Sequence, residues 1–227
     1  MKIGIIGAMQ MEIDDLHEAM EDTSEEIVSG VKFLSGRIGE TEIVAAVCGI
    51  GKVFAAICAE AMILRYQPDQ IINIGVGGSL TRDLGVLDVA VADNVMQHDM
   101  DTSPLGDPVG LLSGINRIFL PADRQIVDAL CRIMAEKKIN YRRGTIATGD
   151  QFIASQEQKE RIRSRFEAIA AEMEGGSIGH VCYINQVPFA ILRSISDSEG
   201  GAMDYQTFAE KAAEQSIEIV KEYIAGL

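Results

Sequence analysis

Carboxylates stand at three points of the chain where chemistry is possible. Glu12 follows the apolar run that ends at Gly7. Glu172 and Glu174 end a second apolar run, and Asp197 ends a third. Ligands of α/β proteins bind at the carboxyl ends of strands. A carboxylate there could activate water, accept hydrogen bonds from two sugar hydroxyls or, with a raised pKa, protonate a ring nitrogen.

Each acid also has a structural interpretation. Glu12 could complement the dipole of a first helical turn, and Asp197 could cap the next helix. Glu172 and Glu174 could form an exposed acidic strand end. Alternate residues of a strand share a face, so these two glutamates are expected to point the same way. Ser196 could orient Asp197.

Glycines form a candidate ligand turn, Gly75-Val-Gly-Gly78, directly after the apolar run 71–74. Such a turn lets the backbone approach a ligand closely, or it is simply a tight connection. The dinucleotide pattern G-x-G-x-x-G fails at Leu80. The phosphate-loop pattern fails because Ala46 stands where a glycine should precede Gly51-Lys52. Chemistry with NAD or with an ATP phosphate loop is therefore disfavoured.

Metal and nucleophile chemistry find little support. The three histidines are separated from one another, and the four cysteines form no C-x-x-C pair. We expect no metal and no cofactor, and we expect His98 and Asp99 to form a local hydrogen-bond pair. The remaining carboxylate-only site suits hydrolysis through a cationic, oxocarbenium-like transition state.

Alternating strand and helix patterns position these residues. The composition predicts strands at 2–7, 42–48, 70–74, 87–96, 142–147, 168–172 and 188–194. Helices are expected over 11–20, after Gly51, around 126–138 and at the C-terminus. This alternation predicts one α/β domain over residues 1–227 with a mixed or mostly parallel sheet. The longest irregular region, about 97–121, is expected to be functional and to pack against something because it is partly apolar.

Composition limits the possible partners and location. The 227 residues carry 20 Lys+Arg and 34 Asp+Glu, a formal charge of −14, which argues against nucleic acid and anionic membranes. No apolar stretch approaches the ~18–20 residues of a membrane helix, and the N-terminus does not resemble a signal peptide. With scattered cysteines, these features predict a cytoplasmic protein.

Several segments together resemble a known family over nearly the whole chain, and their order and spacing make the resemblance specific. They are MKIGIIGAMQMEI, CGIGK, PDQIINIGVGGSL, the HD pair, TGDQFI, AEMEGGSIGHVC and RSISD. The family is the 5′-methylthioadenosine/S-adenosylhomocysteine nucleosidases of the purine nucleoside phosphorylase superfamily. The resemblance implies a mixed, twisted, barrel-like sheet surrounded by helices, and a homodimer.

The resemblance also implies a reaction: water cleaves the N-glycosidic bond of a 5′-thio-substituted adenosine, in methionine salvage and methyl-cycle recycling. Glu12 resembles the base that positions water, Asp197 the acid that protonates adenine N7, and Glu174 the acceptor of ribose hydroxyls. Further substrate-binding positions implied by the resemblance are Met9, Ile50, Val76, Phe152, Ile153, Glu172, Met173, Arg193, Ser196 and, from the neighbouring subunit, Leu105 and Ser113.

Three positions depart from the family pattern. Val76 stands where a serine is usual, and its absent hydroxyl is expected to slow the reaction by up to about tenfold. Leu105 and Ser113 replace residues that are often an aromatic and a proline, which leaves the 5′-substituent open. The alternatives are a nucleosidase for another purine nucleoside, such as aminodeoxyfutalosine, and a catalytically weak nucleoside-binding protein. Phosphorolysis is disfavoured because 9–17 contains no Arg or Lys to bind phosphate.

Overall fold

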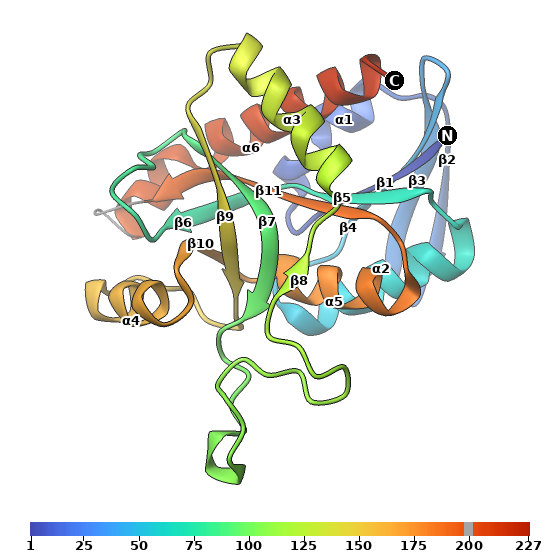
Figure 1. Ribbon diagram of the computed structural model, residues 1–227. Helices are drawn as coiled ribbons and strands as arrows, with labels where there is room; N and C mark the ends of the chain where they lie inside the picture. Colours follow the sequence, from blue (N-terminus) through green and yellow to red (C-terminus); the bar gives the residue numbers. More distant parts are fainter. Residues whose placement is uncertain (198–201) are drawn as a thin grey trace.

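A computed structural model describes residues 1–197 and 202–227, without the side chains of 202–204 and 206 (Figure 1). The described strands form one eleven-stranded sheet in the order β2-β3-β4-β1-β5-β11-β6-β10-β9-β7-β8. These strands are β1 (Lys2–Gly7), β2 (Glu21–Val28), β3 (Val31–Ile38), β4 (Thr41–Val47), β5 (Gln70–Asn73), β6 (Val76–Ser79), β7 (Val89–Gln97), β8 (Leu120–Pro121), β9 (Tyr141–Thr148), β10 (Ala168–Glu172) and β11 (Phe189–Asp197).

Strand β11 closes part of this sheet into a ring. It pairs in parallel with β5 and β6, and its middle pairs antiparallel with β7. Because β6, β10, β9 and β7 also pair in succession, the five strands β11-β6-β10-β9-β7 return on themselves. The expected mixed, barrel-like sheet is therefore confirmed.

Helices cover both sides of the sheet (Figure 1). Helices α1, α3 and α6 lie on one side, α2 and α5 on the other, and α4 beside β10. Their bounds are η1 (Gln10–Glu12), α1 (Asp14–Glu18), α2 (Lys52–Tyr66), η2 (Ser103–Leu105), α3 (Arg124–Glu136), α4 (Gln156–Phe166), α5 (Gly175–Asn185) and α6 (Ala202–Ala225). No helix in the described residues combines the length and apolar character that a membrane crossing requires.

Alternate residues of the central strands supply two cores. Ile5 and Ile72 pack with α3 and α6, whereas the adjacent Ile6 and Ile71 pack with α2 and α5. Both faces of β1 and β5 are buried, which fits the apolar residues at successive positions of β1 and at the centre of β5. The buried strands hold the sheet in place, and the acids lie at or just after the carboxyl ends of its strands β1, β10 and β11.

Some expected elements differ from the structure. The proposed glycine turn contains strand β6, and the helix expected over 11–20 is divided into η1 and α1 by Ile13, which has a non-helical backbone. The apolar residues Val53, Ile57 and Leu64 of α2 are exposed, because the small Ala55 and neighbouring residues face the core instead. Of the region expected to be irregular, about 97–121, residue 97 ends β7 and residues 120–121 form β8. Residues 98–119 are irregular apart from η2 and form an arm with η2 at its tip (Figure 1).

Candidate active site

A cavity of about 370 Å³ lies at the carboxyl ends of β1, β10 and β11. It gathers most of the residues that the sequence singles out. Those that line it are Met9, Glu12, Ile50, Val76, Phe152, Ile153, Glu172, Met173, Glu174, Ser196 and Asp197. These residues come from segments that are far apart in the sequence. The strand order of the sheet brings the segments together.

Both carboxylate oxygens of Glu12 are held by backbone donors. Oε2 accepts the N–H groups of Ala8 at 2.6 Å and Met9 at 2.9 Å, and Oε1 accepts the N–H of Val76 at 3.1 Å. Burial raises the pKa of Glu12 above its usual value, although Arg193 and these three N–H groups oppose the shift. Glu12 is therefore a fixed carboxylate with an increased affinity for a proton.

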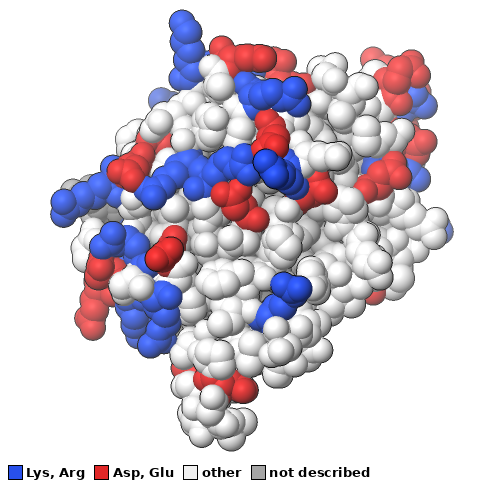
Figure 2. All heavy atoms as spheres, viewed as in Figure 1, with Lys and Arg blue, Asp and Glu red and all other residues white. Residues whose placement is uncertain are grey.

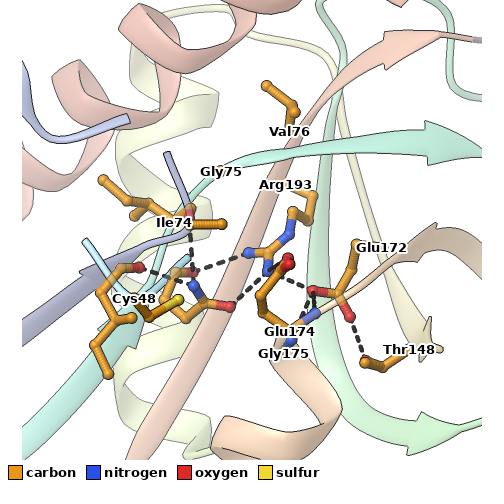
Figure 3. A network of polar contacts seen from close by, with 12 residues as sticks. Cys48, Ile74, Gly75, Val76, Thr148, Glu172, Glu174, Gly175 and Arg193 are labelled. Carbon is orange, nitrogen blue, oxygen red and sulfur yellow. Dashed lines mark hydrogen bonds and ion pairs between the residues drawn. The ribbon is translucent and has the colours of Figure 1, made fainter. Parts of the chain in front are cut away.

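Glycines let strand β6 pass close to two acids. Gly75 has φ +154°, and a Cβ there would lie 2.6 Å from Glu12 Oε1. A Cβ on Gly78 would lie 3.1 Å from Asp197 Oδ1. The glycines predicted to permit a close approach to a ligand thus permit a close approach of the backbone to the acids. At Val76 the backbone N–H contacts Glu12, while the side chain points away from the network in Figure 3.

Glu172 is saturated by partners within the protein (Figure 3). Its carboxylate pairs with the buried Arg193 guanidinium and accepts the Thr148 hydroxyl. Oε2 also accepts the N–H groups of Glu174 at 3.0 Å and Gly175 at 2.6 Å. Glu172 therefore fixes the turn from β10 into α5, where Glu174 stands.

Glu174 has fewer partners than Glu172. Its Oε1 accepts the Gly51 N–H at 2.8 Å, and its Oε2 lies 3.9 Å from Arg193. Burial and then the neighbouring Glu172 raise the pKa of Glu174 to about 7. A carboxylate has about four acceptor positions, so Glu174 can accept further hydrogen bonds from a ligand in the cavity. Glu172 and Glu174 both approach Arg193, although Glu174 lies beyond the end of β10 and is the N-cap residue of α5.

Asp197 ends β11 and is almost completely buried. Its Oδ2 lies 3.3 Å from the Lys159 ammonium, and the Ser196 hydroxyl lies 3.5 Å from Oδ1. Asp197 and Glu12 both line the cavity, and β6 passes beside each of them. The cavity thus combines buried acids with an apolar wall.

A model of the phosphorylase superfamily matches residues 2–225. The 5′-methylthioadenosine/S-adenosylhomocysteine nucleosidase of Staphylococcus aureus strain JH9 is 36% identical over 228 residues, covering 99% of this chain and 100% of that protein. The chain belongs to this nucleosidase family of the phosphorylase superfamily.

Two solved structures have the same fold as this nucleosidase-family chain. A mutant of the Helicobacter pylori nucleosidase with 5′-methylthioadenosine in its active site is 37% identical, with a TM-score of 0.96, covering 100% of this chain and 99% of that chain. The native futalosine hydrolase of Helicobacter pylori strain 26695 is also 37% identical, with a TM-score of 0.95 and coverage of 100% and 98%. The fold is therefore that of the family.

Three of the predicted site residues do not line the cavity of their own chain. Arg193 lies behind its wall, bonded to Asn73 Oδ1 at 2.6 Å and paired with Glu172. Leu105 lies on the arm with 84% of its surface exposed, and Ser113 is exposed on the same arm. Arg193 thus supports the acids from behind, and the two arm residues face outward.

Lys159 and Tyr205 are among the lining residues that the sequence did not single out. Lys159 shares a buried face of α4 with Ile162 and Phe166, so its helical spacing with apolar residues was a usable signal. Tyr205 lies on α6, with its ring 5.7 Å from that of Phe152 in an edge-to-face arrangement. Its position within the long C-terminal helix carried no such signal.

The expected local pair of His98 and Asp99 was wrong. Asp99 accepts instead from the Lys52 ammonium at 2.6 Å and the Asp150 N–H at 2.9 Å, while His98 Nε2 is buried without a hydrogen-bond partner. The imidazole packs closely against Gly149, where a Cβ would lie 2.3 Å from Nε2. Within the described part of the chain, no group of three His, Cys, Asp or Glu residues could hold a metal.

Proposed function

We propose that this protein hydrolyses the N-glycosidic bond of 5′-methylthioadenosine and S-adenosylhomocysteine, releasing adenine and the thioribose. The observation that carries the proposal is the cavity that presents Glu12, Glu174 and Asp197 together. The named activity of the Staphylococcus aureus relative supports the same substrates. 5′-Deoxyadenosine, which carries the same base and sugar, is proposed as a further substrate.

The three acids divide the proposed reaction among them. Glu12 accepts a proton from water as the water oxygen bonds to the sugar carbon C1′. Asp197 donates a proton to adenine N7 as the C1′–N9 bond breaks, so adenine leaves as a neutral base. Glu174 accepts hydrogen bonds from the ribose hydroxyls, and the anionic carboxylates stabilise the positive charge that develops on the sugar.

The remaining lining residues form the proposed binding surface. Phe152 and Ile153 flank the adenine, Met9, Ile50 and Met173 contact the nucleoside, and Ser196 orients Asp197. The backbone N–H of Val76 donates to Glu12, and this bond does not need a serine side chain. The serine hydroxyl that is absent here would therefore affect contacts with the ligand, and the support of Glu12 is intact.

Hydrolysis is favoured over phosphorolysis because the two cations nearest the acids are already paired with carboxylates. A phosphate dianion needs cationic ligands. Lys159 already pairs with Asp197, and Arg193 is buried against Glu172. A phosphate in this cavity would face the carboxylates of Glu12 and Glu174, whose charge repels it.

A related nucleoside is the second candidate substrate. The Helicobacter pylori futalosine hydrolase is 37% identical to this chain over essentially its whole length. Aminodeoxyfutalosine also carries adenine on a 5′-substituted ribose, so the same acids would serve it. The choice between these nucleosides depends on the pocket for the 5′ substituent, to which we assign Leu105 and Ser113.

We also propose that the protein is a homodimer of the cytoplasm. Exposed apolar side chains at Ile50, Val53 and Phe54 lie at the start of α2, and Leu105 is exposed on the arm. Apolar surface of this kind is typical of a protein interface. The four cysteines are free thiols, which is typical of proteins in a reducing compartment.

The test is to incubate the purified protein with 5′-methylthioadenosine, S-adenosylhomocysteine, 5′-deoxyadenosine, aminodeoxyfutalosine and inosine and to measure the free base. We expect adenine from the 5′-substituted adenosines, no dependence on phosphate, and a free sugar product. Glu12→Gln and Asp197→Asn should each remove most turnover while leaving the fold intact. A sugar 1-phosphate would refute hydrolysis, and no base from any nucleoside would favour the binding-protein alternative.

A further inference from the structure

Three residues behind the cavity form a closed ring of polar contacts. The Lys52 ammonium donates to Asp99 Oδ1 at 2.6 Å, and the Asp150 N–H donates to Asp99 Oδ2 at 2.9 Å. The Lys52 backbone N–H donates to Asp150 Oδ1 at 2.8 Å. Each residue thus takes part in two of the three bonds. A closed ring fixes the relative positions of its three segments more firmly than separate pairs would.

The Lys52–Asp99 ion pair of the ring is better shielded from water than the surface ion pairs, whereas Asp150 is exposed. The side chains of Lys52 and Asp99 are 19% and 18% exposed, against 38% and 49% for Lys137 and Glu222, a pair with the same 2.6 Å separation. Burial opposes the ionisation of Asp99, but its bonds to Lys52 and to the Asp150 N–H lower its pKa overall. Less exposure means less screening, so this ion pair holds its geometry more firmly.

The ring joins segments that also form the cavity. Lys52 directly follows Gly51, whose N–H donates to Glu174 Oε1 at 2.8 Å. Asp150 lies two residues before Phe152 on the cavity wall. A shift in the ring would therefore move both a donor to the proposed ribose acid and the proposed adenine wall.

The Asp150 carboxylate also leaves little room for a side chain at Gly51. Gly51 has φ +99°, and a Cβ there would lie 3.0 Å from Asp150 Oδ1. Gly51 is the N-cap residue of α2 and has no side chain to bond the first turn. Asp150 supplies that acceptor from a distant part of the chain, in the place of an ordinary capping side chain.

We propose that Lys52, Asp99 and Asp150 form a clamp that positions the Gly51 N–H against Glu174, which makes Asp99 a positioning residue for the reaction. This inference rests on the proposed function only in its kinetic consequence, since the geometry of the clamp is independent of the substrate. Asp99 lies outside the cavity lining and acts through Gly51.

The clamp has a consequence for pH dependence. The Gly51 N–H lowers the pKa of Glu174, which burial raises to about 7. If the N–H moves away, that pKa rises further, so the ionised acceptor forms only at higher pH. The other titratable or charged groups that act on Glu174 or feel its charge are Glu12, Cys48, Glu172, Arg193 and Tyr205. None of them is altered by a change at Asp99.

The ring predicts a specific order among variants. Asp99 uses both oxygens, so Asp99→Asn can keep only one of its two bonds. Asp150 accepts through one oxygen, so Asp150→Asn can keep its bond and Asp150→Ala cannot. We expect Asp99→Asn and Asp150→Ala to lose about 10- to 100-fold in kcat/KM for 5′-methylthioadenosine. Their lower pH limb should move upward by roughly half to one unit, and Asp150→Asn should stay near wild type.

Hydrogen exchange of the Gly51 amide, followed by NMR, tests the clamp without any substrate. Exchange should be faster than wild type in Asp99→Asn and Asp150→Ala and unchanged in Asp150→Asn. The matched control is Glu222→Gln, which breaks the Lys137 pair between α3 and α6 and should change neither exchange nor kinetics. Unchanged Gly51 exchange in Asp99→Asn, or a lowered melting temperature with an unshifted pH profile, would overturn the proposal. An inactive wild type would refute only the proposed function.

Discussion

The acids that line the cavity have different partners within the protein, so they differ in how many hydrogen bonds and charges they can still accept from a ligand. Glu172 is occupied by Arg193 and the backbone, whereas Glu12 and Glu174 keep carboxylates whose pKa burial raises. A buried carboxylate without a full counterion gains most from a cation placed beside it. The cavity is thus better matched to a positively charged sugar than to a neutral one, which is the difference that accelerates a reaction.

Glu174 is expected to be costly for stability and necessary for activity. With a pKa of about 7 in place of 4.5, the folded protein holds a proton between these pH values that the unfolded chain has released. The free energy of unfolding therefore falls as the pH rises through this window, and the whole loss is present above it. Glu174→Gln removes the ionisation and can still accept the Gly51 N–H.

We expect Glu174→Gln to unfold at a higher temperature than wild type at a pH well above 7. The gain in the free energy of unfolding should be on the order of 2 kcal/mol. Each kcal/mol raises the melting temperature by about 2–4 °C in a chain of this size. Its kcat/KM should fall by roughly 10- to 100-fold through weaker hydrogen bonds to the ribose. Thermal melts at high pH and below pH 4.5 check the first part, because the difference should vanish in acid. A gain of equal size at both pH values would contradict the assignment.

The sequence was informative about the acids and silent about their partners. Glu12, Glu174 and Asp197 each follow an apolar run, which marked them as candidates, and all three line one cavity in the structure. The pairing of Glu172 with Arg193 joins two strands that local patterns do not align. The helical spacing of Lys159 with apolar residues predicts its burial, but its ion partner on β11 depends on the tertiary fold.

At the scale of elements, strand β6 and the glycine before it determine how closely the backbone approaches Glu12, the proposed general base. A Cβ on Gly75 would lie 2.6 Å from Glu12 Oε1, so Gly75→Ala must displace the carboxylate or the strand. We expect kcat/KM to fall on the order of 100-fold, as for a misplacement of about 1 Å. Stability should fall by at least about 1 kcal/mol because φ is +154° at this position.

A matched variant separates the displaced acid from backbone strain. Gly39 has φ +57°, and a Cβ there would meet nothing within 4 Å. Gly39→Ala should therefore lower the melting temperature without changing kcat/KM. If Gly75→Ala keeps wild-type kinetics, the close approach of β6 has no role in holding Glu12.

Elements with strong apolar patterns were predictable, and those without them were not. The bounds of β1 and β10 agree with the pattern to the residue. Strand β2 is almost wholly exposed and rich in acids, so no core-facing alternation marked it. It exists because β3 supplies its hydrogen bonds, which is a relation between segments. The same applies to β6, whose glycines have no strand propensity of their own.

For the whole molecule, the ring closure by β11 is the feature that local patterns could not predict. The antiparallel pairing of Leu192 with Val91 joins residues about a hundred positions apart. The alternation of strands and helices predicted the α/β class, and the family resemblance supplied the barrel. Once closed, the ring brings the ends of β10 and β11 together, and this produces the cavity from distant segments.

Charge is unevenly distributed over the molecule. Figure 2 shows Lys, Arg, Asp and Glu side chains gathered over the upper part and left edge of this face. The part around the arm is largely uncharged, with a few acids near its base. Leu105 is 84% exposed on this arm. An apolar residue held out on a projecting segment fits an interface between two copies of the chain better than contact with water.

The proposed dimer makes a joint prediction about assembly and activity. Light scattering of the wild type should give about twice the 24.6 kDa of one chain. Leu105→Asp places a charge in an apolar contact, so it should weaken both dimerisation and turnover of 5′-methylthioadenosine, the latter by roughly tenfold or more. Ile27→Asp is the control, because Ile27 is 72% exposed on β2, far from the arm in Figure 1, and should change neither property. An active monomer, or Leu105→Asp with unaltered kinetics, would mean that the pocket for the 5′ substituent is built within one chain.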